Sequence, residues 1–254
     1  MTVKMLVAER KQLLLGRLHD EGKVVAREVA QELGISEDSI RRDLRDLAGA
    51  GHCQRVYGGA VPVSRAVVDY RSRAAVEPES KRRIAARAAQ LIKPGDRVIL
   101  DGGTTTLAVT RELPPGLHAT VITHSPTIAA ALIDHPSVEI LLLGGRIYKH
   151  SAVACGAATA EAARAITADL FLLGVTGVHV QHGLTTGDAE EAAMKRTLAG
   201  QAADTYVLAS SEKIGAVSPY KVLELDAITA ILTDAPKDSL DALRHTAPAI
   251  IECQ

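Results

Sequence analysis

Three arginines lie close together in a stretch that the sequence pattern predicts to be a helix. Arg41, Arg42 and Arg45 cluster on one side of a helix that begins after Ser36, at about 100° per residue. A guanidinium group is planar and can donate two parallel hydrogen bonds to the O6 and N7 atoms of guanine. A helix with such a face suits insertion into the major groove of DNA.

The opposite side of this helix explains how the arginines would be held in place. Ile40, Leu44 and Leu47 share one narrow apolar stripe that can pack on a small core. The Ser36 hydroxyl can cap the helix by accepting a hydrogen bond from a free backbone N–H of the first turn.

An ordinary surface helix is the alternative interpretation of the same pattern. Charged residues on a wet helix face commonly pair with one another, and Asp43 and Asp46 lie near the arginines in the sequence. The neighbouring segments therefore have to distinguish the two interpretations.

Those neighbours favour DNA binding. Helices are predicted over 9–20 and 25–33, and residues 52–62 can form a hairpin that carries Arg55 and Tyr57. Short helices followed by a hairpin predict a winged helix-turn-helix domain over residues 1–61. The predicted DNA contacts are Ser36, Ser39, Arg41, Arg42, Arg45, Arg55 and Tyr57.

Composition limits the remaining possibilities. The 254 residues exceed one small DNA-binding domain, so a second domain is expected, and 29 basic against 30 acidic residues give no global signal for nucleic acid. Cys53, Cys155 and Cys253 lie far apart without zinc-binding spacing. We expect reduced thiols, no metal or cofactor, no membrane segment and a cytoplasmic location.

The second part of the chain is predicted to be an α/β sensor domain with a parallel sheet. A polar linker is expected over 62–79 and the domain over 80–254, starting with a helix. Short apolar runs then alternate with helical stretches, which is typical of a parallel sheet covered by helices. The strands are predicted at 97–100, 119–123, 139–143, 169–174, 205–209 and 230–233, and the helices at 105–112, 125–134, 159–167 and 189–203.

The first of these strands ends in a loop suited to anion binding. Asp101, Gly102, Gly103, Thr104, Thr105 and Thr106 run directly into a helix. Ligands of parallel sheets bind beyond the carboxyl ends of the strands, where glycines permit close approach and a helix N-terminus offers free N–H groups. The loop lacks the Gly-Lys-Ser/Thr ending of a P-loop. A turn capped by Thr104 is the simpler alternative, but we expect a phosphate site.

Other predicted strand ends carry small and polar residues as well. If they converge on one crevice, they can form a pocket for a sugar phosphate. The further residues predicted to bind this effector are His124, Ser125, Gly145, Arg146, Ser151, Gly177 and Lys213.

Nearly the whole chain resembles the DeoR-type transcriptional regulators. The resemblance rests on two N-terminal motifs, Gly34–Leu44 and Arg55–Ala60, and on five C-terminal features: Lys81 with the helix after it, Asp101–Thr106, Thr123–Ser125, Leu143–Gly145 and the region Gly174–Gly183. It implies a C-terminal domain similar to ribose-5-phosphate isomerase that senses a phosphorylated sugar. It also implies a homodimer or homotetramer that binds double-stranded operator DNA and represses genes of carbohydrate metabolism.

The sequence departs from the family pattern at several positions. His124 stands where members usually carry Asn, and Ser210 and Glu212 replace the usual arrangement of Asp and Ser before the lysine. The wing segment 52–55 is less apolar and less basic than in relatives. We expect these changes to alter the ligand contacts and to reduce nonspecific phosphate contacts.

A sugar-phosphate isomerase is the competing functional class. Moving a proton between adjacent carbons requires a carboxylate base beside the substrate. The segment 174–178 contains no acid, and Glu190 and Glu191 are explained as a solvated helix N-terminus. A nucleotide-binding scaffold is a third possibility, but the sequence lacks the glycine fingerprint of a dinucleotide site. We therefore expect a regulator and not an enzyme.

Overall fold

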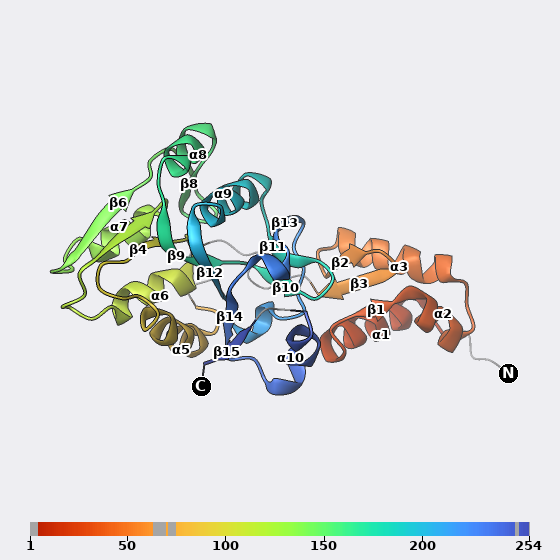
Figure 1. Cartoon of the computed structure of the whole chain (residues 1–254). Coiled ribbons are helices and arrows are strands. Elements are labelled where there is room, and N and C mark those ends of the chain that lie inside the picture. The colour runs from red at the N-terminus through yellow and green to blue at the C-terminus, as the bar shows by residue number, and fades with distance from the viewer. Residues whose placement is uncertain (1–4, 63–69, 71–74, 247–248, 254) are drawn as a thin grey trace.

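The computed structural model describes residues 5–62, 70, 75–246 and 249–253, and Figure 1 colours them in chain order. Much of the predicted linker, residues 62–79, lies outside the described residues. Within the described ranges, no helix is both long and apolar enough to cross a bilayer.

The N-terminal region forms the predicted winged helix-turn-helix. Its elements are α1 (Val7–Asp20), β1 (Val24–Val25), α2 (Ala26–Leu33), α3 (Glu37–Gly49), β2 (Cys53–Val56) and β3 (Gly59–Pro62). The hairpin of β2 and β3 was predicted, whereas the two-residue strand β1, which adds to β3, was not. The predicted apolar stripe is confirmed, because Ile40, Leu44 and Leu47 are buried with Leu14 of α1 and Val29 of α2.

The second region is built on a parallel sheet, also as predicted. Among the described residues seven strands form this sheet, in the order β15-β14-β12-β9-β4-β5-β6. Their bounds are β4 (Arg97–Leu100), β5 (Ala119–Thr123), β6 (Val138–Leu142), β9 (Ala168–Gly174), β12 (Ala202–Leu208), β14 (Ala230–Thr233) and β15 (Ile250–Glu252). Every pairing within the sheet is parallel.

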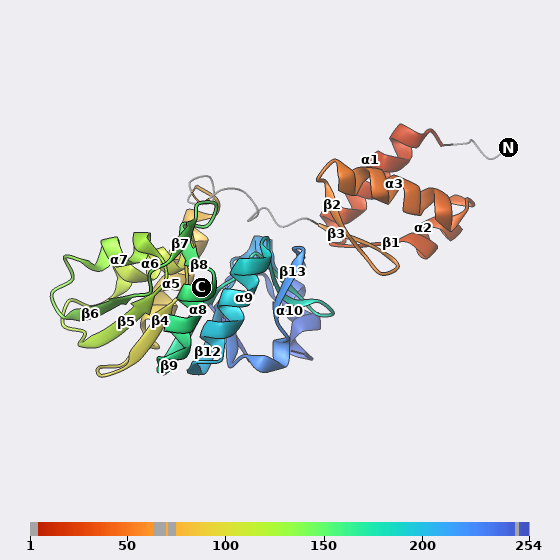
Figure 2. The same cartoon turned by 90° about the horizontal axis from the view of Figure 1, so that it is seen from above.

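Helices cover both faces of the sheet, as Figures 1 and 2 show. One face is covered by α5 (Pro78–Ala89), α6 (Thr104–Glu112) and α7 (Pro126–Leu132), and the other by α8 (Ala157–Arg164), α9 (Ala189–Ala199) and α10 (Lys237–Arg244). Successive side chains of β4 point to opposite faces of the sheet. Val98 and Leu100 are buried in the core under α5, α6 and α7, whereas Ile99 is buried in the core under α8, α9 and α10. Burial on both faces explains why these strands are almost continuously apolar.

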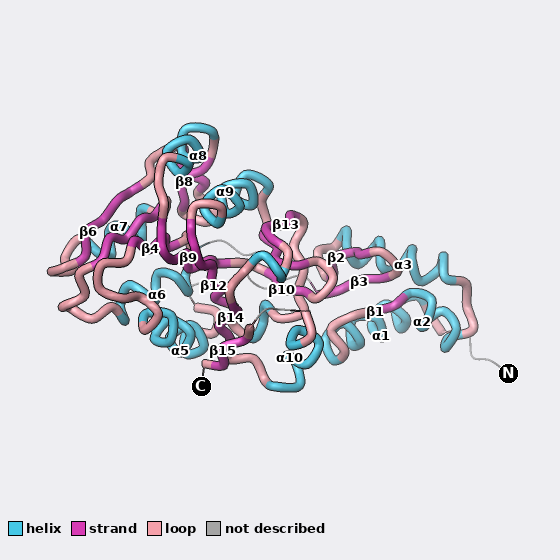
Figure 3. The backbone as a smooth tube through the Cα atoms, in the orientation of Figure 1, coloured by secondary structure: helices cyan, strands magenta, loops and turns pink. Residues whose placement is uncertain are grey.

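Several short elements of this region were not predicted. Figure 3 shows the small strands outside the main sheet. They are a hairpin of β7 (Arg146–Tyr148) with β8 (Val153–Cys155), and an antiparallel sheet of β10 (Gly177–His179), β11 (Gly183–Thr186) and β13 (Tyr220–Leu223). Helix α10 and strand β15 were also missed, and 3-10 turns occur at η2 (Ser211–Lys213) and η3 (Leu225–Ala227).

The strand order places a topological switch between β4 and β9. From β4 the chain continues to β5 and β6 on one side, whereas β9, β12 and β14 follow one another on the other side. The loops after β4 and β9 therefore diverge at the carboxyl edge of the sheet, which is where open α/β sheets bind ligands.

Candidate functional sites

Two residues, Gly34 and Ser36, determine the turn between α2 and α3. Gly34 ends α2 in the left-handed conformation with φ 63°, which a glycine adopts without steric penalty. Ser36 then caps α3 as predicted, since its Oγ accepts a hydrogen bond from the backbone N–H of Ser39 at 3.3 Å.

The arginines of α3 keep an exposed face. Arg41, Arg42 and Arg45 are all exposed, and Arg41 forms an ion pair of 2.7 Å with Glu37. Within the described residues, Arg42 and Arg45 form no ion pair.

The two aspartates of α3 bind α1 instead of the arginines. Asp43 is buried and forms an ion pair with Arg10, and Asp46 pairs with Lys11 at 2.7 Å. Both ion pairs join α1 to α3, so neither aspartate forms an ion pair with Arg41, Arg42 or Arg45. The alternative of an arginine face neutralised by its own aspartates is therefore not what the structure shows.

The wing lies beside α3 and completes the candidate DNA surface. Arg55 is exposed on β2, and Tyr57 at the hairpin turn is fully exposed. A groove of about 440 Å³ between the helix and the wing is lined by Arg41, Leu44 and residues 55–59. All seven residues predicted to contact DNA belong to α3, to its cap or to the adjoining wing, and their contact with DNA stays a prediction.

A cleft of about 470 Å³, its open mouth included, lies at the switch point of the main sheet. Its lining combines the loop after β4, the loop after β9 and the turn after β12 with polar side chains of α5, α9 and β11. The lining residues are Val76, Lys81, Gly102–Thr106, Gly174–Thr176, Thr186, Glu191, Lys195, Glu212 and Lys213.

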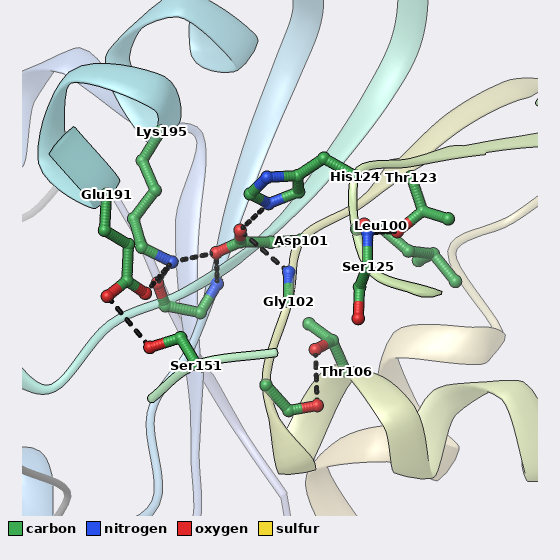
Figure 4. A network of polar contacts seen from close by, with 12 residues as sticks. Leu100, Asp101, Gly102, Thr106, Thr123, His124, Ser125, Ser151, Glu191 and Lys195 are labelled. Atoms are coloured by element: carbon green, nitrogen blue, oxygen red, sulfur yellow. Dashed lines mark hydrogen bonds and ion pairs between the residues drawn. The ribbon is translucent and has the colours of Figure 1, made fainter. Parts of the chain in front are cut away.

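Asp101 is the buried hub beneath this cleft (Figure 4). Its Oδ1 accepts a hydrogen bond from the backbone N–H of Gly102 at 2.8 Å and lies 3.0 Å from Nε2 of His124. Its Oδ2 accepts from the N–H of Gly174 at 2.9 Å and from Nζ of Lys195 at 2.5 Å. One carboxylate thus ties together the ends of β4 and β9, the residue after β5, and α9.

Lys195 holds a second carboxylate as well. Its Nζ lies 3.2 Å from Oε1 of Glu191 and donates to the carbonyl of Gly174 at 2.9 Å, while the Ser151 hydroxyl donates to the other oxygen of Glu191 at 3.0 Å. Figure 4 shows this chain of contacts. The lysine side chain is only 2% exposed, so the network is held away from water.

The electrostatics of the network favour charged groups despite burial. Burial by itself would raise the pKa of the Asp101 carboxyl, but Lys195 and His124 outweigh burial and hold that pKa below its ordinary value. Burial likewise acts to lower the pKa of Lys195, but Asp101 and Glu191 raise it above its ordinary value. We therefore describe Asp101 and Lys195 as an ion pair.

Two members of this network were missed or misinterpreted from sequence. Lys195 was not predicted, and Glu191 was assigned to a solvated helix N-terminus, which is wrong because its side chain is 6% exposed. Glu190 fits that assignment, since it is exposed and pairs with Arg146. The spacing of Glu191 and Lys195, one helical turn apart, was the available signal.

Glycine at position 102 is required by close packing. A Cβ atom there would lie 1.9 Å from Cγ1 of Val153 on β8. Gly103, with φ 139°, then turns the chain into α6. The loop backbone thereby approaches the β7–β8 hairpin and leaves the N-terminus of α6 facing the cleft.

The structure brings part of the predicted effector set into the cleft. Gly102 to Thr106 and Lys213 line it. Asp101, His124 and Ser125 are fully buried and do not belong to the lining, and Ser151 contacts Glu191 instead. The remaining predicted residues, Gly145, Arg146 and Gly177, are outside the lining as well.

Each of those three residues has another environment. Gly145 lies against Thr159, where a Cβ would approach Oγ1 to 2.0 Å, and the Arg146 side chain is 81% exposed. Gly177 packs against the carbonyl of Ala216 in the small sheet.

Comparison with known proteins assigns both regions to the same family. Residues 10–66 match the DeoR-like helix-turn-helix domain, and residues 76–235 match the DeoR C terminal sensor domain. The putative aga operon transcriptional repressor of Escherichia coli O157:H7 is 30% identical, with 96% of this chain and 93% of the relative covered. The HTH-type transcriptional repressor GlcR of Bacillus subtilis (strain 168) is 34% identical, with 91% and 89% covered.

Solved structures with a related arrangement are more distant. Ribose 5-phosphate isomerase A from Methanocaldococcus jannaschii matches with 17% identity and a TM-score of 0.40, covering 54% of each chain. The sorbitol operon regulator SorC from Klebsiella pneumoniae matches with 14% identity and a TM-score of 0.42, covering 90% of this chain and 97% of that one. The two family models, in contrast, match both regions of the chain, and the E. coli relative is 30% identical over almost its whole length. The chain therefore belongs to the DeoR family of DNA-binding transcriptional regulators.

Proposed function

We propose that this regulator is a repressor of carbohydrate genes whose binding to operator DNA is controlled by a phosphorylated sugar in the cleft. The observation that carries the ligand part is a set of unpartnered polar atoms. Of the described residues, four have a buried side-chain N or O atom without a hydrogen-bond partner in the protein. Three of them, Thr105, Thr186 and Glu212, line this one cleft.

An unpartnered buried polar atom is costly, at about 1–3 kcal/mol. Concentration of such atoms in one cleft is expected where a polar ligand supplies the missing hydrogen bonds. A sugar phosphate has the required chemistry, because it combines hydroxyl groups with an anion.

The phosphate group is assigned to the loop before α6. Free backbone N–H groups at the N-terminus of this helix face the cleft, and the unpartnered hydroxyl of Thr105 lies in its first turn. Lys81 and Lys213 add two cationic side chains to the same lining. Positive charge, N–H donors and a hydroxyl together favour an anion over a neutral sugar.

The repressor role is supported by the names of the relatives and by the exposed arginine face of α3. In this proposal α3 enters the major groove and the wing contacts the DNA backbone or minor groove. The effector binds one arrangement of the protein better than the other and so shifts the population that is competent to bind DNA.

Thr105→Val tests the phosphate assignment. Valine has nearly the same shape, and the hydroxyl that it removes has no hydrogen-bond partner among the described residues, so the stability should not fall. Binding of glucose 6-phosphate and of inorganic phosphate, measured by calorimetry, should weaken about 10- to 100-fold, because a hydrogen bond to a charged group is lost.

Thr110→Val is the matched control, because its hydroxyl donates to the carbonyl of Leu107 within α6, outside the cleft lining. It should leave ligand affinity unchanged. Equal phosphate affinity of the Thr105 variant and the native protein would contradict the phosphate assignment.

Isomerisation remains the second candidate, because the carboxylates of Glu191 and Glu212 line the cleft. Glu191 is held by Lys195 and Ser151, which disfavours it as a base. We expect no interconversion of aldose and ketose phosphates above the uncatalysed rate, measured by NMR with ribose 5-phosphate and glucose 6-phosphate. Turnover that disappears in Glu212→Gln would instead establish the enzyme.

A further inference from the structure

The turn after β12 presents one carboxylate oxygen to the cleft in a fixed direction. The hydroxyl of Ser210, which is fully buried, donates to Oε1 of Glu212 at 2.7 Å. The other oxygen, Oε2, is buried and has no hydrogen-bond partner among the described residues. Ser210 therefore orients the Glu212 carboxylate and leaves one of its oxygens for a group inside the cleft.

A second unpartnered atom belongs to the same lining. Thr186, at the end of β11, is fully buried, and its Oγ1 has no partner in the described part of the protein. A threonine hydroxyl can donate or accept, whereas an ionised carboxylate can only accept. A ligand group that satisfies Glu212 must therefore bring an N–H or O–H donor.

A ligand carboxylate would fail at this position. Two carboxylates side by side repel one another, and neither has a proton to donate. Lys81 and Lys213 line the same cleft, but the proposed function assigns them to the phosphate group.

We propose that Glu212, oriented by Ser210, is the specificity-determining residue of the sensor. It selects phosphorylated sugars that carry a hydroxyl or ammonium group away from the phosphate, and it rejects phosphorylated sugar acids. This inference rests on the proposed function, because it presumes that the phosphate occupies the loop before α6.

The test compares ligands that share a 6-phosphate and differ at the other end. Glucose 6-phosphate, glucosamine 6-phosphate, 6-phosphogluconate and inorganic phosphate are titrated into the full-length protein by calorimetry. We expect the first two to bind at least about 10-fold more tightly than 6-phosphogluconate, as one unfavourable charge contact implies.

Glu212→Gln removes the charge and keeps the shape and an acceptor for Ser210. We expect the preference over 6-phosphogluconate to fall to within about 3-fold, because the Gln amide can donate to a carboxylate. Affinity for inorganic phosphate should not fall, because the loss of a negative charge from the cleft cannot weaken the binding of an anion. Glu161→Gln, on an 81% exposed side chain of α8, is the control that should retain the native preference.

The outcomes separate this inference from the proposed function. An unchanged preference in Glu212→Gln, with phosphate binding intact, overturns the role of Glu212 and leaves the phosphate site standing. Binding of inorganic phosphate without any of the three sugar phosphates also overturns it. Absence of binding by all four compounds overturns the proposed function and this inference together.

Discussion

Lys195→Met is expected to destabilise the sensor region by about 3–5 kcal/mol near neutral pH, the usual cost of removing one partner from a buried ion pair. The substitution leaves the carboxylates of Asp101 and Glu191 without the cation that they share. Methionine fills most of the volume, so loss of charge compensation is the main effect. The candidate DNA surface on α3 is not altered directly.

The pH dependence identifies the cause of this loss. The pKa of Asp101 is lowered in the native protein, so its contribution to stability is present above the ordinary pKa of 3.8 and is lost as the pH falls through the lowered value. Without Lys195, burial acts with less opposition and raises the pKa of Asp101. Acidification then protonates this carboxyl and removes the buried uncompensated charge. The difference in the free energy of unfolding between the variant and the native protein should therefore shrink towards low pH.

Urea unfolding, followed by circular dichroism at about pH 5 and about pH 8, measures both effects. Lys237→Met, on an exposed side chain of α10, is the control and should stay within about 0.5 kcal/mol of the native protein. A loss below about 1 kcal/mol for Lys195→Met would contradict the assigned buried ion pair, as would a deficit that does not depend on pH.

Arg42→Ala is expected to weaken binding to the operator by about 5- to 150-fold at fixed salt. This range corresponds to the roughly 1–3 kcal/mol of a good bidentate contact between an arginine and a base. Arg42 is exposed on α3, and it forms no ion pair with the described residues, so little rearrangement of the free protein is expected.

Fluorescence anisotropy with an operator selected from random DNA by the native protein provides the measurement. If Arg42 contacts a base, discrimination against substituted operators falls. If it contacts phosphate, binding weakens uniformly and the salt dependence becomes shallower by about one. Arg111→Ala, an exposed arginine on α6, is the control. Native affinity in Arg42→Ala would contradict placement of α3 in the groove.

The parts of the fold that sequence predicted are those with strong local signals. The cap at Ser36, the turn at Gly34 and the apolar runs of six of the seven strands in the main sheet depend on neighbouring residues, and these were found. Strands such as β1 and β7 are short and partly polar, and only pairing with distant segments makes them strands. Their sequence therefore carries little independent signal.

The same reasoning explains the candidate sites. The loop after β4 was found because glycines and threonines directly before a helix are a local pattern that indicates an anion-binding turn. The role of Lys195 depends on Asp101, which lies 94 positions away, and no local pattern indicates that contact. His124 was predicted to contact the effector, but it is fully buried and contacts Asp101 instead, a position that follows from the pairing of β5 with β4.

The contact between the Asp101 carboxylate and the Gly102 N–H has a consequence for the kinetics of sensing. Folding of the sheet already fixes the start of the loop before α6, because the same carboxylate is held by Gly174 and Lys195. Ordering one residue costs about 1–2 kcal/mol of conformational entropy, and here that cost is met before a ligand arrives. Association of the proposed effector should then be limited by diffusion into the cleft and not by a slow ordering step, which would allow a rapid response to its concentration.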